Sequence, residues 1–235
     1  MDYTLIRSPK RRTIGITVQH AQVRVSAPVG VCVTTIERFV DTKRSWIERH
    51  LQAQQSNLAS LPVRRWCHGE EVLWLGQRYR LDVRDGYRNT IDAIDKTLVV
   101  RLSRRTIDRT ERTKQLVISW YQGQALRWLN EHMPAISASV QQTPKKWRVS
   151  HYRAKWGACD RQGTLSFSWR LFAAPDWVVD YVVVHELCHL RHFNHSAAFW
   201  ALVELHRPDY PEAERWLKAH GHTLLNDTVF SYLTP

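Results

Sequence analysis

The residues best suited to chemistry lie between positions 185 and 195. A His-Glu-x-x-His pattern places His185 and His189 four residues apart, and His195 follows six residues later. Two histidines four apart on a helix project from the same face and can bind one zinc ion. Glu186 lies about 100° around the helix, where it can deprotonate a metal-activated water instead of binding the metal. The spacing predicts a catalytic zinc site with His185, His189 and His195 as ligands and one open position.

The neighbouring sequence predicts the elements that position these side chains. Pro175 and Asp176 suit the first turn of a helix, and apolar residues then recur at spacings of three and four. Asn194 is the expected end of this helix, and Ser196 is a suitable N-cap for a second one. His195 is therefore expected in the tight connection between the two helices, where the chain can turn it back toward the metal.

The third ligand has alternatives. Glu204 or His206 on the second helix could serve, although the spacing favours His195. The metzincin zinc motif has its third histidine at the same offset but carries a glycine at the position of His192. Glycine permits a left-handed turn there, and histidine tolerates that conformation less well, so this chain is expected to turn at Asn194 instead. His192 itself is expected to be a partly exposed residue at the helix end, complementing the helix dipole.

Several segments beyond the motif resemble the YgjP-like metal-dependent hydrolases, predicted zinc metallopeptidases related to the SprT and WLM groups. They are Arg-Ala-Lys-Trp-Gly-Ala-Cys at 153–159, Leu-Ser-Phe-Ser-Trp-Arg-Leu at 165–171, the motif segment 180–189, Asn-His-Ser at 194–196 and Phe-Trp at 199–200, with weaker likeness at 11–14, 27–28 and 43–47. The resemblance implies a zincin-like core and peptidase chemistry. Nucleoside triphosphate pyrophosphatase activity, on UTP in particular, has also been attached to this group.

Hydrophobic patterning predicts an α+β fold with two regions. A β-rich N-terminal region, residues 1–105, contains a helix over about 34–55, and a zincin-like metallohydrolase core of helices packed on a small mixed sheet spans 106–235. The smaller segments are a small antiparallel sheet within 2–33, strands near 71–75, 77–83 and 97–102, a helix over 107–133 ending before Pro134, strand-like segments at 138–142 and 146–153, and a return strand at 164–168. If 164–168 is a free sheet edge, it can pair with an extended peptide.

The charge of the chain favours anionic partners. Its net charge is +12 and its pI is about 9.9, which suits an anionic substrate, a nucleotide or a nucleic acid as well as a merely well-solvated surface. Basic residues gather at 10–12, 64–65, 101–112, 145–148 and 153–155, and the last two clusters are interleaved with aromatic residues. The candidate substrate-binding residues are Lys155, Trp156 and Arg170, and the candidate oxyanion donors are Arg170, His206 and Tyr181.

The cysteines and the N-terminus indicate a compartment. Cys32, Cys67, Cys159 and Cys188 form no Cys-x-x-Cys pair, so a reducing environment suits them, and Cys159 and Cys188 are expected to be structural. The sequence shows no secretory signal and no membrane-spanning run, which predicts a cytoplasmic protein with no membrane partner. It gives no indication of oligomeric state.

Three functions fit these features. A zinc-dependent, peptidase-like hydrolase with Glu186 as general base comes first. A nucleotide pyrophosphatase could use the same site, with phosphate charge balanced by cations of the 145–155 stretch: Lys145, Lys146, Arg153 and Lys155. A nucleic-acid-binding module with structural zinc is the third. Zinc is inferred from ligand type, and other divalent transition metals also bind histidines.

Overall fold

The chain consists of two compact units. A computed structural model describes residues 2–19, 22–59 and 64–224, and these form an α+β structure with small mixed sheets and six α-helices. Contacts divide the chain into Met1–Pro62 and Val63–Pro235. This division differs from the predicted boundary between 105 and 106, because the strands at 71–103 share one hydrophobic core with the helices that follow.

The first unit packs two helices on a three-stranded sheet. Its elements are β1 (Thr4–Ser8), β2 (Gly15–Gln19), β3 (Gln22–Pro28), α1 (Val33–Thr42) and α2 (Arg44–Ala59). The strand order is β1-β3-β2, with β1 parallel and β2 antiparallel to β3, so the predicted purely antiparallel sheet is wrong. The predicted single helix is divided at Lys43, and Ile36, Val40 and Ile47 bury its apolar face against the sheet.

The second unit contains two sheets and the remaining helices. The four-stranded sheet has the order β4-β5-β7-β6, and the three-stranded sheet has the order β8-β10-β9. The elements are β4 (Glu71–Trp74), β5 (Gln77–Gly86), β6 (Thr90–Ile94), β7 (Thr97–Ser103), α3 (Arg109–Val140), β8 (Lys146–Ser150), β9 (Gly157–Cys159), β10 (Thr164–Ser168), the 3-10 helix η1 (Trp169–Ala173), α4 (Asp176–Cys188), α5 (Ala197–His206) and α6 (Tyr210–Leu224).

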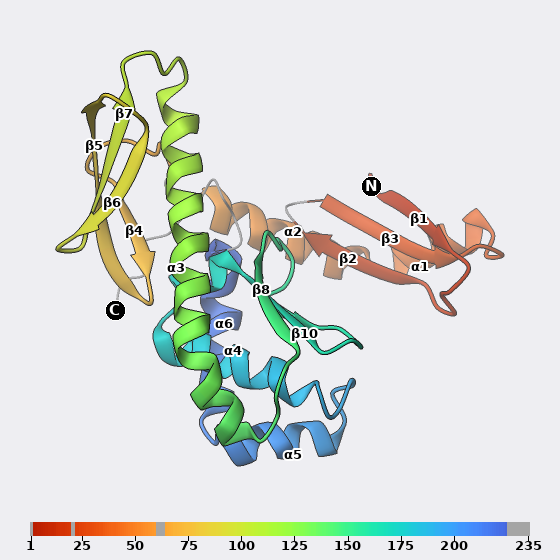
Figure 1. Ribbon diagram of the computed structural model, residues 1–235. Coiled ribbons are helices and arrows are strands. Elements are labelled where there is room, and N and C mark those ends of the chain that lie inside the picture. Colours follow the sequence, from red (N-terminus) through yellow and green to blue (C-terminus); the bar gives the residue numbers. More distant parts are fainter. Residues whose placement is uncertain (1, 20–21, 60–63, 225–235) are drawn as a thin grey trace. The chain divides into compact units, whose positions relative to one another are not determined.

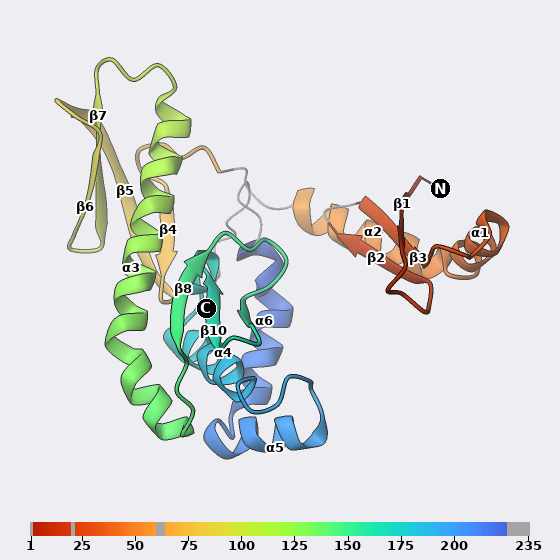
Figure 2. The same ribbon diagram turned by 45° about the vertical axis from the view of Figure 1, so that its right-hand side comes forward.

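Helix α3 is the longest helix that the structure describes in this unit. Its 32 residues make it about 48 Å long. The four-stranded sheet lies beside its N-terminal half, and β8, α4 and α5 lie toward its C-terminal half (Figures 1 and 2). In the part of the chain that the structure describes, no helix, α3 included, combines the length and the apolar character needed to cross a membrane.

Two predictions around α3 are wrong for the same reason. The helix continues through Pro134 instead of stopping before it, and the predicted strand at 138–142 belongs mostly to the helix, which ends at Val140 with Gln141 in a left-handed conformation (φ 55°). Proline removes one backbone hydrogen bond. Met133, Ser137 and Val140 nevertheless bury one helix face on both sides of it, so tertiary packing outweighs the local preference.

The β4–β5 turn supports the start of α4. Leu75 donates its backbone N–H to the Phe172 carbonyl (2.8 Å), and the Trp74 ring stacks on the Phe172 ring at 5.7 Å. Gly76 has a φ of +75°, and a Cβ at that position would lie 3.0 Å from the Cα of Pro175. A glycine is therefore needed for the turn to pack against the N-cap of α4.

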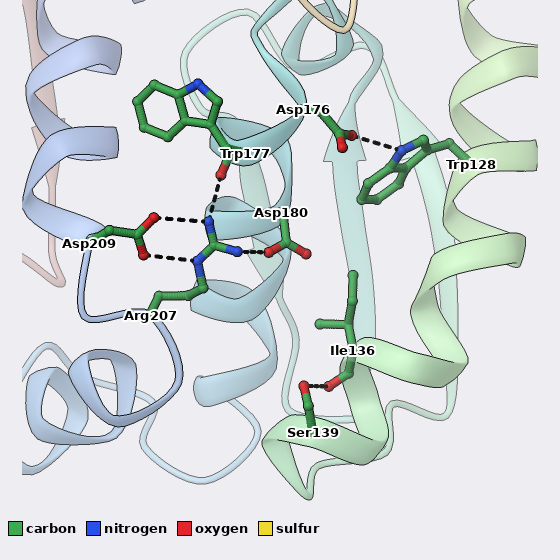
Figure 3. A network of polar contacts seen from close by, with 8 residues as sticks. All are labelled: Trp128, Ile136, Ser139, Asp176, Trp177, Asp180, Arg207 and Asp209. Atoms are coloured by element: carbon green, nitrogen blue, oxygen red, sulfur yellow. Dashed lines mark hydrogen bonds and ion pairs between the residues drawn. The ribbon is translucent and has the colours of Figure 1, made fainter.

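Arg207 ties the α5–α6 connection to α4 (Figure 3). Its guanidinium donates to the Asp180 carboxylate and to the Trp177 carbonyl (3.2 Å), both on α4, and also to the Asp209 carboxylate (3.2 and 3.3 Å). The side chains of Arg207 and Asp180 are only 20% and 25% exposed. Most of the water that could replace these bonds is therefore excluded.

Arg207→Ala is expected to lower the free energy of unfolding by about 2–3 kcal/mol, because it leaves a largely buried carboxylate without its partner. Urea denaturation measures the change. Arg215→Ala, which removes an exposed pair with Glu212 at 4.0 Å, is the matched control and is expected to cost less than about 0.5 kcal/mol. Equal effects of the two substitutions would contradict this role of Arg207.

Candidate metal centre

Helix α4 carries the first two histidines of the motif. His185 lies in its last turn, and His189 is its C-cap, with helical φ and ψ of −67° and −18°. The helix ends at Cys188, six residues before the predicted end at Asn194. Short turns follow, including a bond from the His192 N–H to the Cys188 carbonyl (3.1 Å). No residue from 189 to 195 has a positive φ, so this connection does not need the glycine that metzincins carry at the position of His192.

Three imidazole rings converge at the end of α4. The Nε2 atom of His195 lies 3.2 Å from the Nε2 atom of His185. One ligand atom from each of His185, His189 and His195 lies within 4.8 Å of the others. The connection between α4 and α5 therefore brings His195 back to the helix pair, as its place in the sequence predicted. This set of three nitrogen donors could hold one divalent metal ion.

Hydrogen bonds on the opposite ring nitrogens orient two of these rings. The Nδ1 atom of His189 donates to the His192 carbonyl (2.8 Å), which leaves the lone pair on its Nε2 atom. The Nδ1 atom of His185 lies 3.4 Å from the Tyr181 hydroxyl, and its Nε2 atom faces His195. Such outer partners fix the tautomer that a metal ligand needs.

The protonation of the rings also suits a metal. Burial, with the nearby His189 and His195, lowers the pKa of His185 to about 3. Burial lowers the pKa of His189 as well, against the opposing effect of its bond to the His192 carbonyl. Both rings are therefore neutral at physiological pH, and neutral imidazole is the form that binds metals. The donor chemistry of this cluster fits zinc.

Helix α5 forms an aromatic wall against the three rings. The buried Phe199 ring lies 4.4 Å from the His189 ring and 4.9 Å from each of the His185 and His195 rings. Trp200 lies 5.7 Å from the His195 ring. The helix begins after Ser196, as predicted, although the Ser196 side chain makes no capping bond. The alternative ligands Glu204 and His206, also on α5, lie outside the histidine cluster.

Glu186 lies beside the histidines in a space that a glycine leaves open. Its side chain is buried, and a Cβ at Gly157 of β9 would lie 2.5 Å from its Oε1 atom. Burial raises the pKa of Glu186 to about 8, whereas the positive charge of Lys155 opposes this rise. A carboxyl group with such a pKa can both accept and return a proton near neutral pH.

A pocket of about 530 Å³ opens over these groups. Helix α4, β9 and the segment before it, the α4–α5 connection and α6 all contribute to its lining, as follows: Lys155, Trp156, Gly157, Ala158, Cys159, Tyr181, Val182, His185, Glu186, His189, Phe193, His195, Glu214 and Leu217. Two of the three predicted substrate-binding residues, Lys155 and Trp156, are therefore at the pocket. Tyr181 is the one predicted oxyanion donor that lines it.

The structure does not bring Arg170 to the pocket. This residue is only 2% exposed, its guanidinium donates to the Tyr152 carbonyl (3.3 Å), and it stacks 4.3 Å from the centre of the Trp169 ring. The sequence suggested a substrate contact from its charge and its position near the motif. In the fold, Arg170 is part of the buried segment that joins β10 to α4.

Helix α6 supplies pocket residues that the sequence did not reveal. Glu214 and Leu217 line the pocket, and a Cβ at Gly221 would lie 2.7 Å from the Trp156 ring. Gly221 therefore leaves room for Trp156 at the pocket wall. The motif gives no signal for these positions, since they reach the site only through the packing of α6 against α4.

Residues 164–168 form the central strand of the three-stranded sheet, so the condition for an edge at this segment is not met, and β8 and β9 are the edge strands. Strand β10 pairs with β8 on one side and with β9 on the other, and all five of its residues are buried. Hydrogen bonds to β10 lie directly before and after β9: the Ser168 N–H donates to the Trp156 carbonyl (2.7 Å), and the Asp160 N–H donates to the Thr164 carbonyl (3.0 Å). By antiparallel alternation, the backbone groups of Gly157 and Cys159 point to the open edge.

Neither cysteine near the motif has the character of a nucleophile. Burial, with the nearby charges of Glu186 and Asp160, raises the pKa of Cys159 to about 11. Burial alone raises the pKa of Cys188 to about 11. A reactive thiol needs a lowered pKa. Both residues are therefore thiols at physiological pH, and Cys188 is fully buried.

Comparison with known proteins shows the family of this chain. The YgjP-like metallopeptidase domain matches residues 12–220, and the chain belongs to the YgjP-like family. Among solved structures, the metallopeptidase zymogen abylysin of Pyrococcus abyssi is similar, with a TM-score of 0.35 and 18% identity over 39% of this chain and 93% of that chain. The search of curated proteins found no match. Membership of this family makes the protein a metal-dependent hydrolase.

Glu186→Gln is expected to stabilise the metal-free protein increasingly as the pH rises. The folded-state pKa of about 8 exceeds the ordinary value of 4.5, so the folded state binds more protons than the unfolded state between these values. The contribution of Glu186 to stability is full at low pH and is lost as the pH approaches 8. The stability of the variant relative to wild type should therefore grow by about 3–4 kcal/mol between about pH 5 and about pH 8, since each pKa unit corresponds to about 1.4 kcal/mol.

Urea denaturation in the presence of a chelator measures this difference. Glu204→Gln, which changes an exposed carboxylate on α5, is the matched control and should show no such trend. A constant difference between wild type and Glu186→Gln across this range would mean that Glu186 has an ordinary pKa.

Proposed function

We propose that this protein is a zinc-dependent peptidase in which His185, His189 and His195 hold the metal and Glu186 is the general base. The observation that carries the proposal is the convergence of the three imidazoles beside a buried carboxyl group in one pocket. Zinc is favoured among the divalent metals because all three donors are imidazole nitrogens. Fewer than four protein ligands leave a position for water or substrate, as catalytic sites require.

Different residues of the chain have different roles in the proposed hydrolysis. Zinc, when bound, supplies a Lewis acid that lowers the pKa of water and polarises the scissile carbonyl. The carboxylate of Glu186 accepts a proton from the attacking water and later delivers it to the leaving nitrogen. Lys155 favours the ionised form of Glu186, which is the form that acts as a base. Tyr181 and the His192 carbonyl hold the rings of His185 and His189 in place.

The exposed edge of β9 is the proposed docking site for the peptide backbone. Gly157 and Cys159 direct their backbone groups to that edge, and Gly157 is also the residue that contacts Glu186. A substrate paired with β9 as an added strand would therefore lie next to the general base. This mode of recognition uses main-chain hydrogen bonds for affinity and tolerates many side chains.

The pocket favours a peptide over a nucleoside triphosphate. A pyrophosphatase needs several cations around the phosphates. Of the four cations proposed for that task, only Lys155 lines the pocket, together with the carboxylate of Glu214. Trp156, Phe193 and Leu217 give the remaining wall an apolar character that suits a peptide side chain.

Glu186→Gln is expected to lower kcat for peptide hydrolysis by about 10²–10⁴-fold while zinc content stays unchanged, because the amide cannot accept the proton. A peptide library with the zinc-loaded protein, followed by kinetics on the best substrate and metal analysis, measures both. Glu204→Gln is the matched control and should keep full activity.

Other substrates decide between this function and its alternatives. Release of pyrophosphate and UMP from UTP that depends on Glu186, with no peptide cleaved, would identify a pyrophosphatase instead of a peptidase. Absence of any hydrolysis, combined with tight nucleic-acid binding that Glu186→Gln leaves unchanged, would identify a binding module with structural zinc.

N-methylation of the substrate backbone is expected to raise KM. Each amide N–H that pairs with β9 contributes about 1 kcal/mol, so methylation at a pairing position should weaken binding about fivefold. Methylation at the next position, where the N–H points away from β9, is the matched control. A series of singly methylated peptides with equal KM values would exclude pairing with the β9 edge.

A further inference from the structure

Two loops lie side by side at the end of the four-stranded sheet. Strands β5 and β7 are parallel, with Gly86 opposite Ser103, so the loops that follow them leave the sheet at the same end of the strands. This end of the sheet lies by the N-terminus of α3, whereas α4 and α5 lie toward the C-terminal half of α3 (Figure 1). The loops are therefore separate from the metal centre.

Asn89 joins these two loops into one surface. Its Oδ1 atom accepts hydrogen bonds from the Ser103 backbone N–H (2.7 Å) and from the Thr106 hydroxyl (3.0 Å). Gly86 packs closely at the base, since a Cβ there would lie 2.9 Å from the Cβ of Arg101. The loops enclose a hollow of about 660 Å³ lined by Asp85, Gly86, Tyr87, Ser103, Arg104 and Arg105.

The surface carries cations that no carboxylate neutralises. Arg88, Arg104 and Arg105 are exposed, and none forms an ion pair within the described residues. Asp85 is paired with Arg109 at 3.0 Å. Asp108 accepts the Glu111 N–H (2.9 Å) as the N-cap of α3. The carboxylates of Asp85 and Asp108 thus already have partners, and the three arginines are available to an anion.

An aromatic ring stands next to these arginines. Tyr87 is fully exposed, at 105% of its reference area, and follows Gly86 directly. Guanidinium groups bind phosphates through paired hydrogen bonds, and an exposed ring offers a face on which a base can stack. A base inside a duplex is already stacked, so a Tyr–Arg surface suits unpaired nucleotides.

We propose that Tyr87, Arg88, Arg104 and Arg105 form a binding surface for single-stranded nucleic acid, termed the loop surface. The arginines contact successive phosphates and Tyr87 stacks on a base. The net charge of +12 attracts the polyanion over a longer range. This surface lies outside the metal pocket, so nucleic-acid binding is independent of the hydrolytic reaction.

Fluorescence anisotropy with a labelled single-stranded oligothymidylate, on the full chain at several salt concentrations, tests the proposal. Arg104→Ala with Arg105→Ala is expected to reduce the slope of log K against log salt by about 1.4, since each lost phosphate contact contributes about 0.7. Tyr87→Ala should weaken binding of the single strand about tenfold, whereas Tyr87→Phe should retain it.

The matched control is the double variant Arg127→Ala with Arg161→Ala, which removes two exposed arginines outside the loop surface. It should leave the salt slope unchanged. Thermal unfolding confirms that each variant is folded. The proposal is overturned if the control loses as much affinity as the loop variant, which would indicate diffuse charge. It is also overturned if inorganic polyphosphate or duplex DNA binds as tightly as the single strand and Tyr87→Ala has no effect.

Discussion

The site depends on the convergence of one ring nitrogen from each of three histidines, and this requires other groups to hold the rings of His185 and His189 by their Nδ1 atoms. His189 is held by the His192 carbonyl and His185 by the Tyr181 hydroxyl. The early end of α4 at Cys188 is part of the same arrangement, because the turns that follow bring the His192 carbonyl back to His189. The buried ring of Phe199 packs against all three histidine rings.

The rest of the second unit can be understood as support for that convergence. The β4–β5 turn packs on Pro175 and sets where α4 begins. Arg207 holds the α5–α6 connection to α4, and the Trp128 indole donates to Asp176 in its first turn (3.1 Å) (Figure 3). Strand β9 closes over Glu186, which desolvates the carboxyl group and raises its pKa. Each contact restricts a different part of α4.

The sequence predicted the parts of the site that depend on local geometry. His185 and Glu186 lie in one helix and His189 caps it, so their spacing alone places them. His195 is close enough along the chain for a short connection to return it. The α+β class and the family followed from the same region. Leu217 and Glu214 could not be predicted, because they reach the pocket through the long-range packing of α6. The position of Arg170 away from the pocket has a related origin, since its charge gives no sign of the Tyr152 carbonyl that it contacts.

Errors in the predicted elements have similar origins. Local signals ended a helix at Pro134, but buried residues on both sides of the proline continue it. Strand β6 was missed because it is short and its residues are mostly exposed. The central position of residues 164–168 in their sheet could not be foreseen, because the three-residue strand β9 that pairs with them is too short to recognise. In each of these elements, packing or pairing between segments distant in the sequence determines the structure.

X-ray absorption spectroscopy at the zinc edge measures whether the three histidines bind the metal. For the zinc-loaded full chain, we expect scattering from three imidazole ligands and one light oxygen or nitrogen donor, with one imidazole lost in His195→Ala. A sulfur ligand, a fourth imidazole, or a spectrum unchanged by His195→Ala would contradict it.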